Sequence, residues 1–315
     1  MEKILIITDL EGIIGVLDLN NTEVNKRLYL NQMCLVISAI RDIFPKVRIT
    51  ICDIHDKGNI SQDLGLSAED VEYIKGITGL LTADLNYDRA LLIGFHGKKG
   101  SGGLFDHTFR PEITNIKYGN EDVGEITLFT DWLVLHGVTV VFVSGEYSIV
   151  DEVKELDQAS IHVVENRLFI RNSKTDIPDL DIDQVYSNLV MGIKSALMKD
   201  LLLTSTPADK EIEINFYNPD VLCYLRKKGY DIRNNHLYFP NLIEFFINIH
   251  DLSMVLNTFL MKLYRVNTLF LRTIEELKIS DDSCDIHVCE ITRKSVYEIT
   301  YADRLLVLRS LGFVK

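Results

Sequence analysis

The sequence has no excess of positive charge and no long apolar segment. It contains 33 Lys and Arg against 46 Asp and Glu, which gives a formal net charge of −13. Nucleic acids and anionic membranes attract concentrated positive charge, so this balance argues against either as the main partner. No stretch approaches the roughly 18–20 apolar residues of a membrane span. The N-terminal run Ile4–Ile7 is also shorter than the about 7–15 apolar residues of a secretory signal. We therefore expect neither nucleic acid nor membrane as a partner.

Cysteine is scarce and odd in number. The five cysteines stand mostly in apolar runs: Cys34, Cys52, Cys223, Cys284 and Cys289. A disulfide framework would need paired cysteines and an oxidising compartment. We therefore expect reduced, buried thiols and a cytoplasmic location.

The composition is that of an ordinary globular protein, with 47% hydrophobic and 25% charged residues over 315 positions. The first two-thirds alternate short β-rich runs with amphipathic helical patterns, which is typical of an α/β fold. We expect a three-layer α/β/α core with a mostly parallel or mixed sheet. The expected strands cover residues 3–8, 47–53, 89–95 and 138–145. The expected helices cover residues 22–44, 68–76, 124–137, 148–157 and 183–200.

The best linker candidate is the run LTSTPAD at residues 203–209. A strand-like alternation follows at 210–217, and a long apolar helical segment at 240–265. We therefore expect three parts, the last two forming a smaller α+β region at the C-terminal side. These are a catalytic α/β domain over 1–205, a C-terminal domain over 206–270 and an extension of unknown role over 271–315.

Side chains that can ligate metals gather where the expected strands end. In an open α/β sheet, the loops after the carboxyl ends of the strands carry the functional groups. Three carboxylates and three histidines fall in or near such loops: Asp9, Glu11, His55, His96, His107 and Glu125. So many ligand-type side chains at one sheet edge predict a site there.

These residue types suit a pair of metal ions. Two histidines and three carboxylates form a nitrogen and oxygen ligand set for Zn²⁺, or for Mn²⁺ or Co²⁺, and leave positions for water and substrate. One carboxylate can bridge two metals about 3.5–4 Å apart, so five protein ligands suffice. Such a pair lowers the pKa of bound water to around 7 and polarises a carbonyl. The residues themselves therefore indicate a metal-dependent hydrolase.

The order of the motifs resembles that of the DppA-type D-aminopeptidases, a family of dinuclear zinc metallopeptidases. The shared motifs are the opening D-x-E-G-I-x-G, a His followed by N-I, then G-x-H, D-H-T and V-G-E. The match is strongest over about residues 1–150. The resemblance implies that Asp9 bridges two zinc ions, with Glu11 and His55 completing one metal site. His96 and Glu125 would complete the other.

The resemblance also implies an activity and an assembly. The chain is expected to be an aminopeptidase or related amidohydrolase that cleaves the N-terminal residue, including a D-amino acid, from small peptides or amino-acid amides by metal-activated water. His107 is similar to the family's catalytic histidine and would act as general base, acid or oxyanion stabiliser. A ring-like homo-oligomer is implied, with a decamer as the family's arrangement. The chain departs from the family at Gly145-Glu146-Tyr147, where a Gly-Asp-Asp-like segment is usual.

Two alternatives stay open. A family member could keep the metals and serve as a binding or assembly protein without peptidase activity. The opening motif also resembles that of haloacid-dehalogenase-like phosphatases. There Asp9 would be the nucleophile, Glu11 would replace an acid/base Asp, and residues 145–151 would imitate the acidic motif. The phosphatase interpretation leaves the three histidines without a role.

Overall fold

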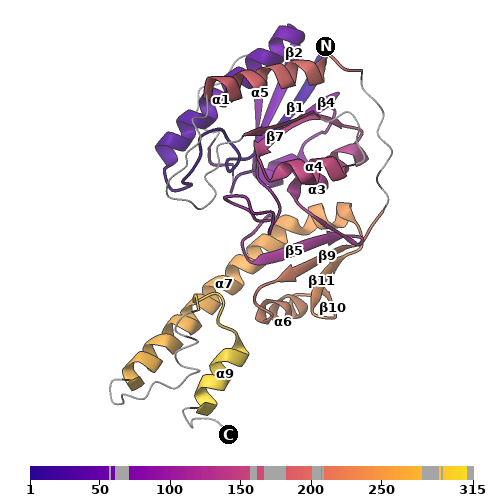
Figure 1. Ribbon diagram of the computed structural model, residues 1–315. Helices are drawn as coiled ribbons and strands as arrows, with labels where there is room; N and C mark the ends of the chain where they lie inside the picture. The colour runs from indigo at the N-terminus through magenta and orange to yellow at the C-terminus, as the bar shows by residue number, and fades with distance from the viewer. Residues whose placement is uncertain are drawn as a thin grey trace. The chain divides into compact units, whose positions relative to one another are not determined.

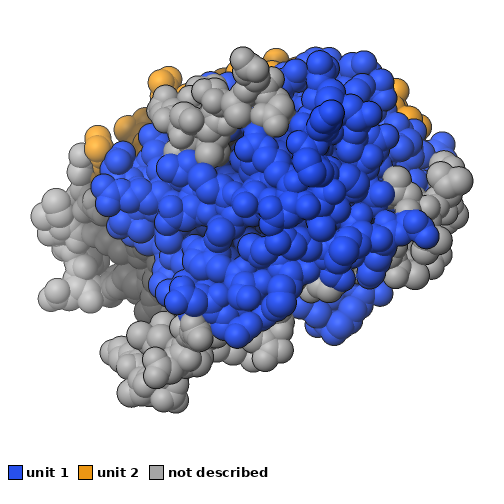
Figure 2. All heavy atoms as spheres, turned by 90° about the horizontal axis from the view of Figure 1, so that it is seen from above, with its two compact units in different colours: residues 1–111, 120–210 blue, residues 112–119, 211–315 orange. Residues whose placement is uncertain are grey.

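The computed structural model describes residues 1–56, 58–60, 71–156, 162–166, 182–200, 207, 209–278, 291 and 294–310 (Figure 1). The chain divides into two units, coloured blue and orange in Figure 2: residues 1–111 with 120–210, and residues 112–119 with 211–315. The segments of the two units alternate along the chain, because strand β5 (Ile113–Tyr118) pairs with strand β9 (Ile212–Phe216), which comes about a hundred residues later in the sequence. The linear division into 1–205, 206–270 and 271–315 stays a prediction about domains.

A six-stranded sheet with the order β3-β2-β1-β4-β7-β8 forms the centre of the first unit. Its strands are β1 (Glu2–Thr8), β2 (Val47–Asp53), β3 (Val71–Lys75), β4 (Arg89–Phe95), β7 (Thr139–Glu146) and β8 (His162–Asn166). All of the pairings are parallel. The strand order reverses between β1 and β4, and the crevice outside the carboxyl ends of strands at such a switch point is where ligands bind in open α/β sheets.

Helices cover both faces of this sheet (Figure 1). On one face, α1 (Thr22–Ile43) packs with α5 (Ile182–Leu197) over a core that includes Ile4 and Ile6 of β1. Leu5 and Ile7 are equally buried, since successive side chains of a strand point to opposite faces. The helices α3 (Glu125–Leu135) and α4 (Ile149–Glu155) pack against each other and against β7, and the short α2 (Gly76–Thr82) lies against β2 and β3. The expected α/β fold with a parallel sheet between helices is confirmed.

The second sheet has the order β10-β11-β9-β5-β6, and β10, β11, β9 and β5 pair antiparallel. The elements not yet given are β6 (Glu121–Val123), α6 (Asp220–Lys227), β10 (Asp231–Arg233), β11 (His236–Phe239), α7 (Leu242–Lys278) and α9 (Tyr301–Ser310). In β9, the buried Ile212 and Ile214 alternate with the half-buried Glu213 and Asn215. This alternation is typical of an antiparallel sheet with one covered face.

One expectation about local structure is wrong. Residues 71–75, expected within a helix over 68–76, form the edge strand β3 instead, while residues 68–70 lie outside the described residues. Pairing with β2 holds this short strand in place, and its burial pattern shows no clear alternation. The apolar helical segment expected over 240–265 is confirmed as α7, which continues beyond the expected end to Lys278.

The thiols are not uniformly buried. The described cysteines are free, but only Cys52 is buried, whereas Cys34 and Cys223 are exposed. Both exposed cysteines lie on helices, α1 and α6, where apolar neighbours in sequence point in different directions. The expectation of buried thiols is therefore wrong for these two. Across the described part of the chain, no helix has the length and apolar character to cross a membrane.

Candidate metal centre

The six side chains singled out from the sequence lie together in the first unit. They form two groups of three, and within each group the ligand atoms lie within 4.8 Å of one another. One group is Asp9, Glu11 and His55, and the other is His96, His107 and Glu125. Five of these side chains follow β1, β2 or β4 or lie in the loop after β4, while Glu125 begins α3.

Asp9 belongs to the first group, and its carboxylate also contacts His96 of the second group. Its Oδ1 is 3.5 Å from Nδ1 of His55, and its Oδ2 is 3.3 Å from Nε2 of His96. The same His55 nitrogen is 3.0 Å from Oε2 of Glu11, and the same His96 nitrogen is 3.4 Å from Oε1 of Glu125. One oxygen of Asp9 thus faces each group, which is the placement that a bridging carboxylate needs.

Backbone contacts with β4 fix the segment that carries Asp9. The amide of Asp9 donates to the carbonyl of Ile93 at 2.9 Å, and the amide of Gly12 donates to the carbonyl of Gly94 at 2.8 Å. A Cβ at position 12 would overlap with the carbonyl oxygen of Phe95. Only glycine allows this close approach, and it explains why the opening motif continues with Gly after the second acid.

Asp53, the last residue of β2, holds the loop that carries His55. Its side chain is fully buried. One oxygen accepts a hydrogen bond from the amide of His55 at 3.1 Å, and the other accepts one from the amide of Ile60 at 2.9 Å. The sequence prediction did not include Asp53, although a carboxylate ending a buried strand two residues before a candidate ligand is a usable signal.

The two remaining histidines are held in one tautomer by backbone carbonyls. Nδ1 of His96 lies 3.0 Å from the carbonyl oxygen of Gly97, and Nδ1 of His107 lies 2.8 Å from that of Phe105. A carbonyl only accepts, so Nδ1 carries the proton and Nε2 is the nitrogen available to a metal or to substrate. The rings stack with centroids 4.1 Å apart and an interplanar angle of 9°.

A second buried carboxylate positions Glu125. Glu152 of α4 accepts hydrogen bonds from the amides of Gly124 and Thr127, both at 3.0 Å, and from the Thr127 hydroxyl at 2.9 Å. It thereby caps the N-terminus of α3, where an anion is favoured by the exposed amides and the helix dipole. Glu125 itself accepts a hydrogen bond from the amide of Phe109 at 2.6 Å. The sequence prediction missed Glu152 because its partners lie in another helix.

The charges of these groups shift one another's pKa values. Burial opposes ionisation of Asp9, but hydrogen bonds from His55 and His96 outweigh it and hold the pKa of Asp9 well below its usual value. Burial and the neighbouring charge of Asp9 raise the pKa of Glu11. Burial disfavours both imidazolium ions, yet the carboxylates raise the pKa of His55 to about 11 and that of His96 well above its usual value. In the metal-free protein the carboxylates therefore favour the protonated form of both rings.

Metal uptake is expected to release protons and to tighten as the pH rises. Because the pKa values of His55 and His96 are raised, a cation must displace a proton from each ring before the nitrogen can bind it. Rising pH removes these competing protons, so the apparent affinity for zinc increases. Calorimetric titration of metal-free protein with zinc, in two buffers of different ionisation enthalpy, measures the protons released. Equal apparent enthalpies in both buffers would contradict this expectation.

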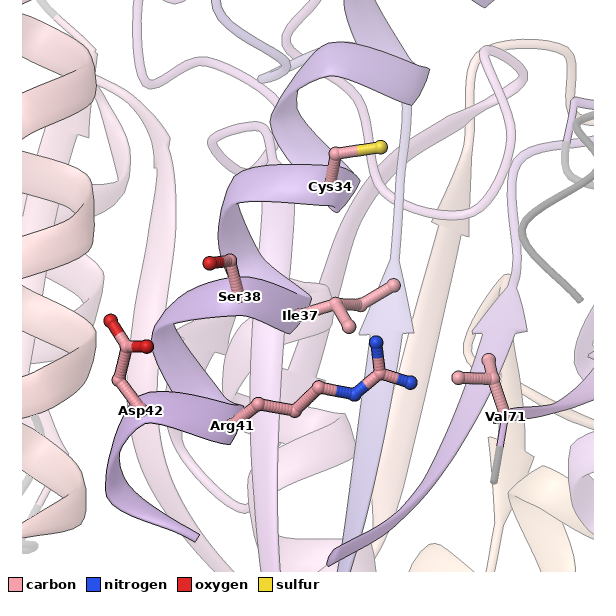
Figure 3. Close-up of a pocket in the computed structure, with 6 residues that line it drawn as sticks. All are labelled: Cys34, Ile37, Ser38, Arg41, Asp42 and Val71. Atoms are coloured by element: carbon pink, nitrogen blue, oxygen red, sulfur yellow. The ribbon is translucent and has the colours of Figure 1, made fainter. Parts of the chain in front are cut away.

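A cavity of about 290 Å³ lies elsewhere in the first unit and includes none of the candidate metal-ligating side chains. Residues of α1 and the first residue of β3 line it (Figure 3): Cys34, Ile37, Ser38, Arg41, Asp42 and Val71. None of the six candidate side chains contributes to this lining, and Asp42 pairs with Lys194 of α5 at 2.6 Å. The chemistry predicted from the sequence therefore lies at the strand ends, away from this cavity's lining.

Comparison with known proteins finds a matching family and a similar solved structure. Residues 2–223 match the model of peptidase family M55, described as D-aminopeptidase, and this range contains all six candidate side chains. The structure is similar to the Zn-dependent D-aminopeptidase DppA from Bacillus subtilis, described as a self-compartmentalizing protease. The TM-score is 0.69 at 19% sequence identity, over 80% of this chain and 97% of that chain. At this identity the likeness establishes the fold. No curated protein matches the sequence.

Proposed function

Because the chain belongs to the D-aminopeptidases, peptidase family M55, we propose that it is a two-metal enzyme that removes the N-terminal residue, including a D-residue, from small peptides or amino-acid amides. The observation that carries this proposal is the position of Asp9, with one carboxylate oxygen toward each group of ligand-type side chains. The family match favours this function over the haloacid-dehalogenase-like phosphatase.

The donor set fits two zinc ions, with Mn²⁺ or Co²⁺ as other candidates. Nitrogen and oxygen donors in groups of three suit these metals and leave coordination positions for water and substrate. Asp9 would be shared, Glu11 and His55 would hold one ion, and His96 and Glu125 would hold the other. When bound, the ions supply Lewis acidity that polarises the scissile carbonyl and lowers the pKa of water.

His107 is the side chain best placed to move a proton. Its Nδ1 is occupied by the carbonyl of Phe105, so Nε2 is the atom that would exchange a proton with the substrate or hold the developing oxyanion. The ring is half-buried, whereas the stacked ring of His96 is 2% exposed. This difference supports a ligand role for His96 and a substrate-facing role for His107.

We also propose that the enzyme is a ring-like homo-oligomer. The structurally similar DppA is described as self-compartmentalizing, and enclosure of the sites would admit small peptides while excluding folded proteins. The net charge of −13 also supports small substrates over polyanionic partners.

Hydrolysis of D-alanine and L-alanine p-nitroanilides by zinc-loaded protein tests the function. We expect release of p-nitroaniline from the D-compound, and its loss in the His96→Ala variant. His250→Ala is the matched control, because this exposed histidine lies on α7 in the second unit. Bound zinc without turnover of either compound would support a binding protein. Phosphate release that needs Mg²⁺ in place of zinc would support the phosphatase.

A further inference from the structure

The loop between His96 and His107 is rich in glycine. Its sequence is GKKGSGGLFD, in which four of ten residues are glycine. Glycine has the largest backbone entropy to lose on folding and no side chain with which to anchor a loop. The place of His107 relative to His96 therefore depends on contacts that other segments make with this loop.

Glu146, the last residue of β7, supplies two such contacts. Its side chain is 1% exposed. Oε1 accepts a hydrogen bond from the amide of Gly97 at 2.9 Å, and Oε2 accepts one from the amide of Leu104, also at 2.9 Å. Oε1 also accepts the hydroxyl of Ser148 at 2.6 Å. One buried carboxylate thus binds the loop at two points seven residues apart, one next to His96 and one three residues before His107.

The loop lies in direct contact with this carboxylate. A Cβ at Gly103 would overlap with Oε1 of Glu146. The hydroxyl of Tyr147, the next residue along the chain, donates to the carbonyl of Gly102. Asp106 accepts hydrogen bonds from the amides of Gly100 and Gly102 at 3.0 and 3.2 Å, so two backbone donors on the exposed side of the loop have a partner. On the buried side, Glu146 binds the amides of Gly97 and Leu104.

We propose that Glu146 is a positioning residue that sets His107 against the ring of His96. Hydrogen bonds to an ionised acceptor are roughly twice as strong as neutral ones, and a buried carboxylate is costly unless its donors stay in place. The carboxylate and the two amides therefore hold one another in place. The catalytic part of this inference rests on the proposed function of His107, while the anchoring of the loop does not.

The variant Glu146→Gln tests this role. An amide NH₂ replaces one oxygen and cannot accept from a backbone N–H, so the loop loses one of its two anchors. We expect kcat to fall about 10- to 100-fold, as small misplacements of catalytic groups cause. KM and the zinc content should stay close to those of the wild type, since no proposed ligand is altered. Hydrogen exchange at the amides of Gly97 and Leu104 should become faster.

Two further variants keep the inference testable if Glu146→Gln folds poorly. Gly103→Ala disturbs the same contact from the loop side and should also lower kcat and speed exchange across residues 97–104. Ser148→Ala removes the third hydrogen bond and keeps both loop amides bound, so its kcat should stay close to that of the wild type.

Hydrogen exchange tests whether Glu146 anchors the loop, and turnover tests whether this anchoring affects catalysis. Faster loop exchange together with a lower kcat at unchanged zinc content supports the positioning role. Unchanged exchange in folded Glu146→Gln overturns the inference, as does a loss of activity that follows only from lost zinc. If the wild-type protein hydrolyses no p-nitroanilide, the proposed function fails, and the exchange data still decide whether Glu146 anchors the loop.

Discussion

Replacing Asp9 with Ala is expected to weaken zinc binding at both positions and to lower kcat/KM by at least about 10³-fold. Asp9 is the residue with one oxygen toward His55 and the other toward His96, so its removal affects both groups at once. A metal contributes several kcal/mol of transition-state stabilisation, and about 1.4 kcal/mol corresponds to a tenfold change in rate. Zinc per chain, measured by elemental analysis after gel filtration, and p-nitroanilide hydrolysis check this.

Glu11→Ala is the matched variant for this experiment. Glu11 lies in the same loop and is equally buried, but its carboxylate contacts His55 and the amide of Leu10, whereas that of Asp9 also faces His96. We expect Glu11→Ala to keep one zinc ion and Asp9→Ala to keep neither firmly. Full retention of one ion in Asp9→Ala, at the affinity of the wild type, would show that the carboxylate does not bridge.

His107→Ala is expected to lower kcat about 10²- to 10⁴-fold while two zinc ions stay bound. This range is typical for the loss of a general acid or base. The Nε2 atom of His107 is available for proton transfer, because Nδ1 faces the carbonyl of Phe105. The experiment separates a proton-transfer role from a metal-ligand role. His107 could also be a ligand, because its ligand atom lies within 4.8 Å of those of His96 and Glu125. Zinc content and kcat are measured on the same preparation.

Loss of one zinc ion in His107→Ala would assign this histidine to the ligands and leave the proton-transfer role without a residue. His136→Ala serves as the control. His136 directly follows α3 in the same unit, and its Nδ1 faces the carbonyl of Trp132 at 2.8 Å, outside both groups. Its removal should change neither the zinc content nor kcat appreciably.

The central strands could be predicted from the sequence because each has a local signature. The buried runs at 47–53 and 89–95 are β2 and β4 with the expected bounds. Two of the strands that escaped prediction depend on distant partners. β3 is a short edge strand beside β2, and β5 pairs with β9 across a long stretch of chain. Pairing of this kind leaves little periodicity in the strand's own residues.

The candidate ligands could be proposed because they follow strands in a characteristic order, which is a property of the chain alone. The carboxylates that support them could not. Glu146 lies in the segment 145–151 that is interpreted, in the phosphatase alternative, as an acidic motif, and Glu152 directly follows that segment. Both are buried and bind backbone amides of other segments, Glu146 those of the loop after His96 and Glu152 those at the start of α3. Burial of this kind arises from tertiary contacts that no local pattern encodes.

An anomalous difference map at the zinc absorption edge, from crystals of the zinc-loaded protein, tests the two-metal centre most directly. We expect two peaks, one on each side of the Asp9 carboxylate. Glu11 and His55 should border one peak, and His96 and Glu125 the other. A single peak, or peaks away from Asp9, would contradict the account.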